Sequence, residues 1–503
     1  MSAKPKISAT NKKEWINRHE NFKQPIDNLY DVQNGETDDV LKDYNNTTTA
    51  LQTLFQKAIA DNKKIRGLGG GWSFSRVAVT DGRMINTKMM NLTFEVDATS
   101  VSPAYPGNSD QLLFAQCGNS ILELHTKLND RERSLKTCGA SNGQTVVGAF
   151  STGTHGSAFD FGATQDFVVG LHIIVSEDRH IWLERNSYPV VADAFVKKLN
   201  TELVRDDDLF NAALVSFGSF GFILGAMIET DEIFLLECYR RRVPYDDTLK
   251  KLMRTLDFTN STMPHGSEHP FHFQALINQY DIADGAYVTT MYKRPFGQYT
   301  ATVVDPNVAG PGDDAADFLG KLFDVIPGLV PAGTNLLIKS QYAPYENQWG
   351  TLGEIFCTTD TRGKVMSTAM GIGLESVNEV DDLLIEVNHN AGPFAGVFAH
   401  RYVKQSKALL GFTHFPVTCV IELDGVFSQK TLSFYNAVWD TMEQRGIPFT
   451  FHWGKINNLN SERIEKMYGD NHDRWIVARQ QLLSQDFLKL FSSQLLIDYG
   501  LDG

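Results

Sequence analysis

The chain has 503 residues, more than one ordinary hydrophobic core can organise, so we expect two or three domains. Hydrophobic residues make up 42% and charged residues 21% of the sequence, which excludes a collagen-like, low-complexity or wholly disordered chain. The 46 lysines and arginines stand against 60 aspartates and glutamates, giving a net charge of −14, and so acidic a surface argues against a nucleic-acid partner.

The first 240 residues or so mix predicted helices with predicted strands. The spacing of apolar residues predicts a helix over Asp39–Asn62. The residues that would form its buried face are Leu51, Leu54, Phe55, Ala58 and Ile59. Strands are expected over Lys64–Leu68, Gln111–Cys117, Phe167–Val175 and His180–Leu183, the last two as a pair, and a second helix over Ser120–Asn129. This mixture within one unit indicates an α+β arrangement.

From Glu237 onward the sequence changes to segments that alternate apolar and polar residues. These segments are Phe271–Leu276, Tyr287–Tyr292, Thr300–Val304, Glu354–Thr358, Leu383–Asn388, Val397–Tyr402 and Thr418–Leu423. A period of two predicts a large antiparallel sheet with one face covered. Asp305–Asp314 is expected to be a loop, and Ser461–Tyr499 a terminal helical region.

Two stretches of small residues point to a ligand. Arg66–Ser75 contains three adjacent glycines, Gly69, Gly70 and Gly71, which let several backbone N–H groups surround one anion such as a diphosphate. A glycine-rich turn without a ligand is the alternative. The spacing fits neither a Walker loop nor a Rossmann fingerprint.

The second stretch, Cys138–Ser157, is rich in small and hydroxyl residues and has no apolar period. Such a chain can pass close along an extended cofactor and donate hydrogen bonds to it. Two such stretches about 80 residues apart are better explained by one diphosphate-bearing ligand than by two idle loops. A third run, Val215–Ala226, has glycines at 218, 221 and 225, for which packing and cofactor contact are both open.

Taken together, these three runs resemble the FAD-linked oxidases of the vanillyl-alcohol oxidase/p-cresol methylhydroxylase type, nearest the sugar-lactone (L-gulonolactone and D-arabinonolactone) and alditol oxidases. The C-terminal His452-Trp453-Gly454-Lys455 is similar to the closing motif of the lactone oxidases, whereas 239–449 match only in general character. The resemblance implies FAD bound by Arg66, Gly67, Gly69, Gly70, Gly71, Trp72, Ser73, Ser141, Thr145, Gly148, Ser151, Gly153, Thr154, His155, Gly156, Gly218, Gly221 and Ile223.

One position departs from this family. Many relatives have Gly-His-Ser where this chain has Gly71-Trp72-Ser73, and that histidine is bonded covalently to the flavin. A tryptophan has no nucleophilic nitrogen for such a bond, and Cys138, a conceivable substitute, lies upstream of the position used by cysteinyl-linked relatives. We therefore expect noncovalent FAD.

Two pairs of residues are candidates for the chemistry. In the resembled oxidases the segment of His452 and Lys455 lies beside the flavin, where a lysine would stabilise the anionic reduced ring and a histidine would act as base or substrate anchor. Arg401 and Glu422 are charges within otherwise apolar predicted strands, and each needs a partner. Glu422 as base with Arg401 as electrostatic support is one interpretation; a structural ion pair, or a charge on the open face of the sheet, is the alternative.

A metal is not expected. His265, His269 and His272 lie close in sequence, but Pro264, Gly266 and Pro270 break any helix there and no fourth ligand is evident, so we interpret the segment as a polar loop. The run Asp206–Asp208 is interpreted as a solvated helix start.

The cysteines and the N-terminus bear on the compartment. Five cysteines without a paired spacing argue against a disulfide framework; they are Cys117, Cys138, Cys238, Cys357 and Cys419. Met1–Lys23 is polar and has no apolar signal segment, and no apolar run approaches the ~18–20 residues of a membrane span. We expect a cytoplasmic protein.

The overall prediction is an α+β flavoprotein with an FAD-binding domain over 1–238, a substrate domain with a large antiparallel sheet over 239–449, and a C-terminal segment, 450–503, that returns to the FAD domain. The resemblance implies oxidation of a CH–OH group of a sugar, lactone or polyol, with oxygen as acceptor. A dehydrogenase with another acceptor, a different hydroxylated or amine substrate, and a noncatalytic binding protein are the alternatives.

Overall fold

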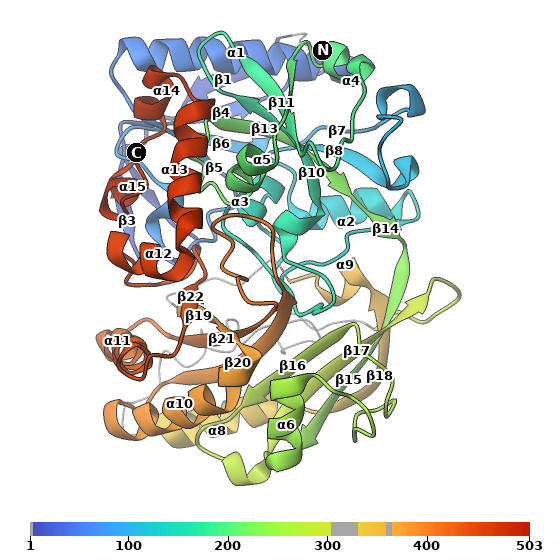
Figure 1. Cartoon of the computed structure of the whole chain (residues 1–503), viewed down its shortest axis with the longest axis vertical. Coiled ribbons are helices and arrows are strands. Elements are labelled where there is room, and N and C mark those ends of the chain that lie inside the picture. Colours follow the sequence, from blue (N-terminus) through green and yellow to red (C-terminus); the bar gives the residue numbers. More distant parts are fainter. Residues whose placement is uncertain (1–3, 303–329, 359–364) are drawn as a thin grey trace.

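A computed structural model describes residues 4–302, 330–358 and 365–503 (Figure 1). Figure 1 shows two smaller sheets with their helices in the upper half and one large sheet in the lower half, with the last helices of the chain returning to the upper half. In the part of the chain that is described, no helix is long and apolar enough to cross a membrane.

The first sheet has the order β1 (Lys6–Ala9), β4 (Asn28–Gln33), β6 (Arg83–Met89), β5 (Ile65–Leu68). A short hairpin, β2 (Glu14–Ile16) and β3 (Lys23–Pro25), precedes β4. Helix α1 (Val40–Ala60) begins where the Asp39 side chain accepts a hydrogen bond from Lys42 N, and it buries Leu51, Leu54, Phe55 and Ala58 as the spacing predicts.

The second sheet has the order β12 (Glu202–Arg205), β11 (His180–Glu184), β10 (Val168–Ile174), β13 (Phe222–Glu229), β8 (Leu112–Gln116), β7 (Thr93–Glu95). Its accompanying elements are α2 (Ile121–Asn129), α3 (Val146–Ser151), α4 (Asp193–Lys198), α5 (Asp207–Leu214), β9 (Arg133–Ser134) and β14 (Asp231–Glu232). Ser120 and Glu123 form a capping box at the start of α2, and Asp206 caps α5. The predicted pairing of β10 with β11 is confirmed.

The third sheet has eight antiparallel strands, as the alternating segments predict. Their order is β18 (Tyr345–Thr351), β15 (Phe234–Val243), β17 (Ala286–Pro295), β16 (His272–Ile277), β20 (Gly396–Lys404), β21 (Val417–Val426), β19 (Val365–Gly373), β22 (Phe449–Phe451). The associated helices are α6 (Asp247–Thr255), α8 (Val330–Gln341), α9 (Leu352–Ile355), α10 (Val377–Ala391) and α11 (Gln429–Gln444). All nine residues of β19 are buried, so both faces of the central strands are covered rather than one.

After β22 the chain returns to the N-terminal half through α12 (Ser461–Tyr468), α13 (Asp470–Leu482), α14 (Gln485–Leu490) and α15 (Gln494–Asp498). In α13, Trp475 Nε1 donates to Val215 O at 3.0 Å. Phe487 of α14 packs edge-on against Phe55 of α1. The predicted terminal helical region is thus present and lies against the N-terminal half, as Figure 1 shows.

Three predicted strands are wrong wholly or in part. Glu354–Thr358 begins within α9, because Thr351 and Glu354 form a capping box, and only Thr358 makes an isolated bridge. Leu383–Asn388 lies inside α10, where the buried residues recur every three or four positions. Residues 300–302 form no strand, and the remainder of Thr300–Val304 lies outside the described residues, as does the predicted loop Asp305–Asp314.

Candidate cofactor and active site

The two predicted cofactor segments lie directly against each other. The glycine loop, residues 69–75 of the first run, follows β5. A Cβ added at Gly69 would overlap the hydroxyl of Thr145, which belongs to the second segment, Cys138–Ser157. A Cβ at Gly143 would lie only 2.6 Å from the ring of Trp72. Only glycine allows these backbones to approach so closely, so the pairing of the two stretches has a steric reason.

A cavity with about 1420 Å³ of empty space, its opening included, lies along both segments. Among the residues named from the sequence, it is lined by Gly67, Gly69, Gly70, Gly71, Trp72, Ser73, Ser141, Thr145, Gly148, Ser151, Thr154, His155, Gly218, Gly221, Ile223, Arg401, Glu422, His452 and Lys455. Residues of the predicted cofactor site and of the predicted catalytic site therefore share one cavity.

Three of the predicted cofactor residues do not line this cavity. Arg66 is buried and donates through Nη1 to Phe217 O at 2.6 Å, which joins β5 to the third glycine run. A Cβ at Gly153 would face the Phe412 ring, and one at Gly156 would face the Cys138 carbonyl. These three positions lie behind the lining and serve its packing.

The glycine loop fits the diphosphate of FAD. Within the described residues, the backbone N–H groups of Gly70, Gly71, Trp72 and Ser73 donate no hydrogen bond. Four successive N–H groups beside a cavity are suited to an anion, and the absence of side chains at 69–71 leaves room for it. The residues present therefore fit the cofactor that the sequence resemblance implies.

Two strands of the sheet and the segment after β22 bring four charged side chains together, of which Arg401, Glu422 and Lys455 line the cavity. Strand pairing sets Ala399 of β20 opposite Glu422 of β21, so Arg401 is diagonal to Glu422 on one face. Arg401 Nε lies 3.1 Å from Glu422 Oε2, and Lys455 Nζ lies 3.7 Å from Asp424 Oδ1. Lys455 Nζ also donates to the Ser367 hydroxyl at 2.8 Å.

Glu422 is ionised in this setting. Burial alone would raise the pKa of its carboxyl, but Arg401 and then Lys455 outweigh burial and leave the pKa below its ordinary value of 4.5. The side chain is only 2% exposed. A buried carboxylate held ionised by neighbouring cations is available to accept a proton.

Two histidines flank the charged group, their ring centroids 5.6 Å apart. Burial, followed by His155 and Lys455, holds the pKa of His452 well below its ordinary value, so His452 is neutral. Its Nδ1 accepts a hydrogen bond from Gly454 N at 3.0 Å, so the proton is on Nε2. His452 therefore presents a donor, which suits a substrate anchor better than a base.

The proton of His155 is on the other ring nitrogen, Nδ1, compared with His452. Burial lowers its pKa to about 4, against the attraction of Glu422, so its ring is neutral as well. The Gly156 carbonyl lies 2.9 Å from Nδ1 and can only accept, which places the proton on Nδ1. The unprotonated Nε2 lies 3.7 Å from Glu422 Oε1. His155 therefore offers an acceptor beside the carboxylate.

The lining also contains residues that the sequence analysis did not name as site residues. Those that lie inside its four predicted runs are Phe74, Gly139, Ala140, Gln144, Val147, Thr152, Phe217, Phe222 and Gly454. Val77 and Ala78 directly follow the first run. His19, Thr87 and Cys117 come from other elements and could be found only from the fold.

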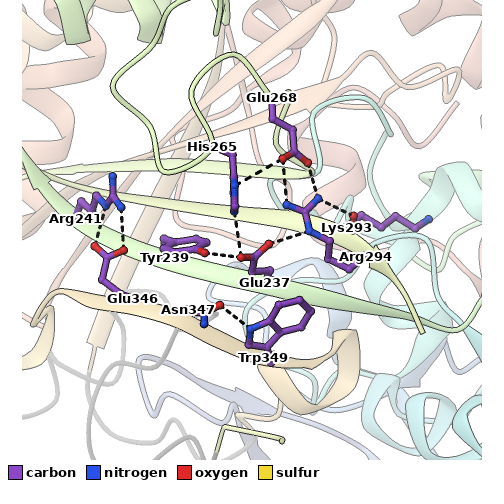
Figure 2. Close-up of polar contacts among 10 residues, drawn as sticks. All are labelled: Glu237, Tyr239, Arg241, His265, Glu268, Lys293, Arg294, Glu346, Asn347 and Trp349. Carbon is purple, nitrogen blue, oxygen red and sulfur yellow. Dashed lines mark hydrogen bonds and ion pairs between the residues drawn. The ribbon is translucent and has the colours of Figure 1, made fainter. Parts of the chain in front are cut away.

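The histidines near β16 do not converge. His265 Nε2 lies 3.1 Å from Glu237 and its Nδ1 3.9 Å from Glu268, in an ion-pair network that Arg294 completes (Figure 2). His269 pairs with Asp160, and His272 is buried in the sheet. Among the described residues no group of three or more histidine, cysteine or acidic side chains could hold a metal ion.

Comparison with known proteins identifies an FAD binding domain in the chain. The family model for an FAD binding domain matches residues 44–184. The L-gulono-1,4-lactone dehydrogenase of Mycobacterium tuberculosis is 24% identical over 447 residues, covering 86% of this chain and 90% of that protein. L-gulonolactone oxidase 3 of Arabidopsis thaliana is 23% identical over 485 residues, covering 82% of this chain and 73% of that protein.

The solved structure of cholesterol oxidase from B. sterolicum shares the fold, with a TM-score of 0.69 over 98% of this chain and 97% of that one, at 13% identity. Its likeness concerns the architecture alone, a two-domain FAD-binding fold with a large antiparallel sheet. The chain therefore contains an FAD binding domain and is an FAD-dependent oxidoreductase, similar over most of its length to sugar-lactone dehydrogenases and oxidases.

Proposed function

We propose that the chain oxidises a CH–OH group of a sugar, a sugar lactone or another polyol, with oxygen as the final acceptor. The observation that supports this most is the shared cavity, which is lined both by the glycine loop and by the charged group of Arg401, Glu422 and Lys455. The relatives named for L-gulonolactone support the substrate class.

Glu422, Arg401 and Lys455 have different roles in the proposed reaction. Bound FAD would supply the hydride acceptor. Glu422 takes the proton of the substrate hydroxyl, because it is ionised and buried, and Arg401 holds its carboxylate in place at 3.1 Å. The ammonium of Lys455 stabilises negative charge that develops in the cavity.

The histidines orient the substrate. His452 donates from Nε2 to a substrate oxygen, since its Nδ1 is occupied by Gly454 N. The Nε2 of His155 accepts from a second hydroxyl or from a water next to Glu422. A donor and an acceptor on adjacent rings suit a polyhydroxylated molecule, whose hydroxyl groups serve in both capacities.

FAD binding is noncovalent in this proposal. Trp72 stands where the covalently linked relatives carry histidine, and its indole lines the cavity without offering a nucleophile. Cys138 does not line the cavity, and burial raises the pKa of its thiol well above the ordinary value, which keeps it protonated and unreactive. Residues 1–238, 239–449 and 450–503 remain the proposed FAD domain, substrate domain and returning segment.

A cytoplasmic location is part of the proposal. The five cysteines all lie in the described part of the chain and form no disulfide there, and four of them are buried. A reducing compartment maintains free thiols. Titration of the denatured protein without reductant should give five thiols, and a lower number would contradict this assignment.

The purified protein tests the function directly. It should bind about one FAD per chain and bleach when a sugar, lactone or polyol from a panel is added without oxygen. Reoxidation by air with formation of hydrogen peroxide supports an oxidase. Turnover only with an added dye identifies a dehydrogenase, the second candidate, which the similarity to L-gulono-1,4-lactone dehydrogenase favours. A flavin that no panel member reduces would leave only a binding protein.

A further inference from the structure

The N-terminal hairpin lies against the glycine loop. Between β2 and β3, Asn17 Nδ2 donates to Ser73 O at 3.1 Å and Asn21 Nδ2 to Phe74 O at 2.9 Å. Arg18 N donates to Gly71 O at 3.0 Å. The hairpin therefore donates to carbonyl groups of the loop, whereas the N–H groups of residues 70–73 have no acceptor among the described residues.

His19, at the tip of this hairpin, lines the cofactor cavity. Its ring stacks on Phe74, with centroids 4.0 Å apart and planes at 8°, and meets Trp72 edge-on at 5.7 Å. The side chain is buried, at 2% exposure, and neither ring nitrogen makes a well-directed hydrogen bond. Leaving a buried polar group unsatisfied is unfavourable, and a hydrogen-bonding ligand in the cavity would remove that cost.

The ring is uncharged. Burial is the main cause that lowers the pKa of His19 to about 3, with Lys455 and Arg18 acting in the same direction and the Trp72 backbone opposing them. A neutral imidazole has one donor and one acceptor nitrogen. It can therefore recognise a ligand by hydrogen bonding but not by charge, unlike Lys455 on the same cavity.

We propose that His19 is a cofactor-binding residue, which hydrogen-bonds FAD from the N-terminal hairpin and makes this hairpin part of the FAD site. The inference rests on the binding of FAD to this cavity. It extends the site beyond the three glycine-containing runs to a segment about 50 residues before the first of them. Stacking on Phe74 sets the plane of the ring, and the hairpin's hydrogen bonds set its position.

Three variants test this. His19→Phe keeps the stack on Phe74 but removes both nitrogens, and His19→Gln restores a donor and an acceptor. His125→Phe is the matched control: His125 is buried in α2 at 3% exposure, has an unpartnered Nε2, and does not line the cavity. The measurement is the dissociation constant of FAD, from titration of flavin-free protein by fluorescence quenching, with the melting temperature of each flavin-free variant beside it.

We expect His19→Phe to weaken FAD about tenfold, the loss of one to two hydrogen bonds, and His19→Gln to regain most of the affinity. His125→Phe should bind FAD as the parent does. Parent-like binding by His19→Phe overturns the proposal, and so does an equal loss in both His19 variants or in the control. If the parent itself takes up no FAD, the proposed function fails before His19 is tested.

Discussion

Four ionisable side chains lie close together at the cavity, where Arg401, Glu422 and Lys455 belong to the lining and Asp424 lies beside Lys455. Glu422 and Asp424 are 2% and 1% exposed, and Arg401 and Lys455 lie within 4 Å of them. Burying a charge is costly, and pairing repays the cost only in part. A cluster of this kind in a cavity is therefore a candidate for chemistry rather than for stability.

Glu422→Gln is the sharpest test at this scale. The amide keeps the shape of the side chain but cannot take a proton, so we expect kcat to fall by about 10²–10⁴-fold with little change in FAD affinity. Stopped-flow reduction of the flavin checks this. Glu184→Gln is the control, because Glu184 is fully buried and paired with Arg205, yet does not line the cavity. A Glu422→Gln protein that reduces flavin at the parental rate would exclude this residue as base.

The dependence of kcat/KM on acidic pH follows from the carboxylate of Glu422. Because the pKa of Glu422 lies below 4.5, the base stays ionised throughout the neutral and mildly acidic range. We expect kcat/KM to be independent of this group through the neutral range and to fall on the acid side with a midpoint below pH 4.5. An acidic limb near pH 6 or 7 in the parent would point to another base.

Trp72 makes the mode of flavin attachment testable. Acid precipitation of the holoprotein should leave its full FAD content in the supernatant, since no nucleophilic side chain replaces the histidine of covalently linked relatives at this position. Absorbance of the supernatant and pellet measures the distribution. FAD added to already denatured protein controls for trapping, and a yellow pellet beyond that control would show a covalent bond.

At the scale of elements, the sequence predicts the N-terminal half well and the sheet domain less well. The helix over Asp39–Asn62 has a long apolar face and a clear cap, and forms as α1. Leu383–Asn388 contains too few residues to separate a period of two from one of 3.6, and it belongs to α10. In so short an apolar segment, a strand and a helix can be distinguished only when the periodicity of the flanking residues is included.

The contact between the glycine loop and the second segment can be tested by adding one methyl group. Gly69→Ala would place a Cβ within the hydroxyl of Thr145, which must move and push the two segments apart. We expect the FAD dissociation constant to rise by tenfold or more, with the circular dichroism unchanged. In Gly297→Ala the added Cβ meets nothing within 4 Å, so this control should bind normally. Normal binding by Gly69→Ala would contradict the close packing.

At the scale of the whole molecule, the site is assembled from parts that the sequence keeps far apart. The cavity takes residues from His19 to Lys455, and Phe74 N donates to Gly454 O at 2.7 Å across that separation. Motifs with unusual composition, such as the glycine loop and the closing His-Trp-Gly-Lys, could be found by reading alone. A single histidine in a polar N-terminal segment could not, because its significance comes only from the stack on Phe74.

Buried histidines outside the cavity also couple the whole molecule to pH. Burial lowers the pKa of His125 to about 4 and that of His272 to about 3, whereas both have the ordinary value of 6.5 when unfolded. Below pH 6.5 the unfolded chain therefore binds protons that the folded chain does not. Stability is fully present above pH 6.5 and is lost as pH falls toward the folded pKa values.

We accordingly expect the melting temperature of the flavin-free protein to be level above pH 6.5 and to decline between pH 6.5 and 5, each histidine contributing up to about 1.4 kcal/mol per pH unit. This window precedes the loss from Glu422, whose depressed pKa acts only below 4.5. Replacing both histidines by glutamine removes two of the buried titrating groups and should make the decline shallower, whatever its effect on stability at pH 7.5. His19, His155 and His452 continue to contribute to the decline in this variant. An unchanged slope in the double variant would mean that other groups govern the acid sensitivity of the fold.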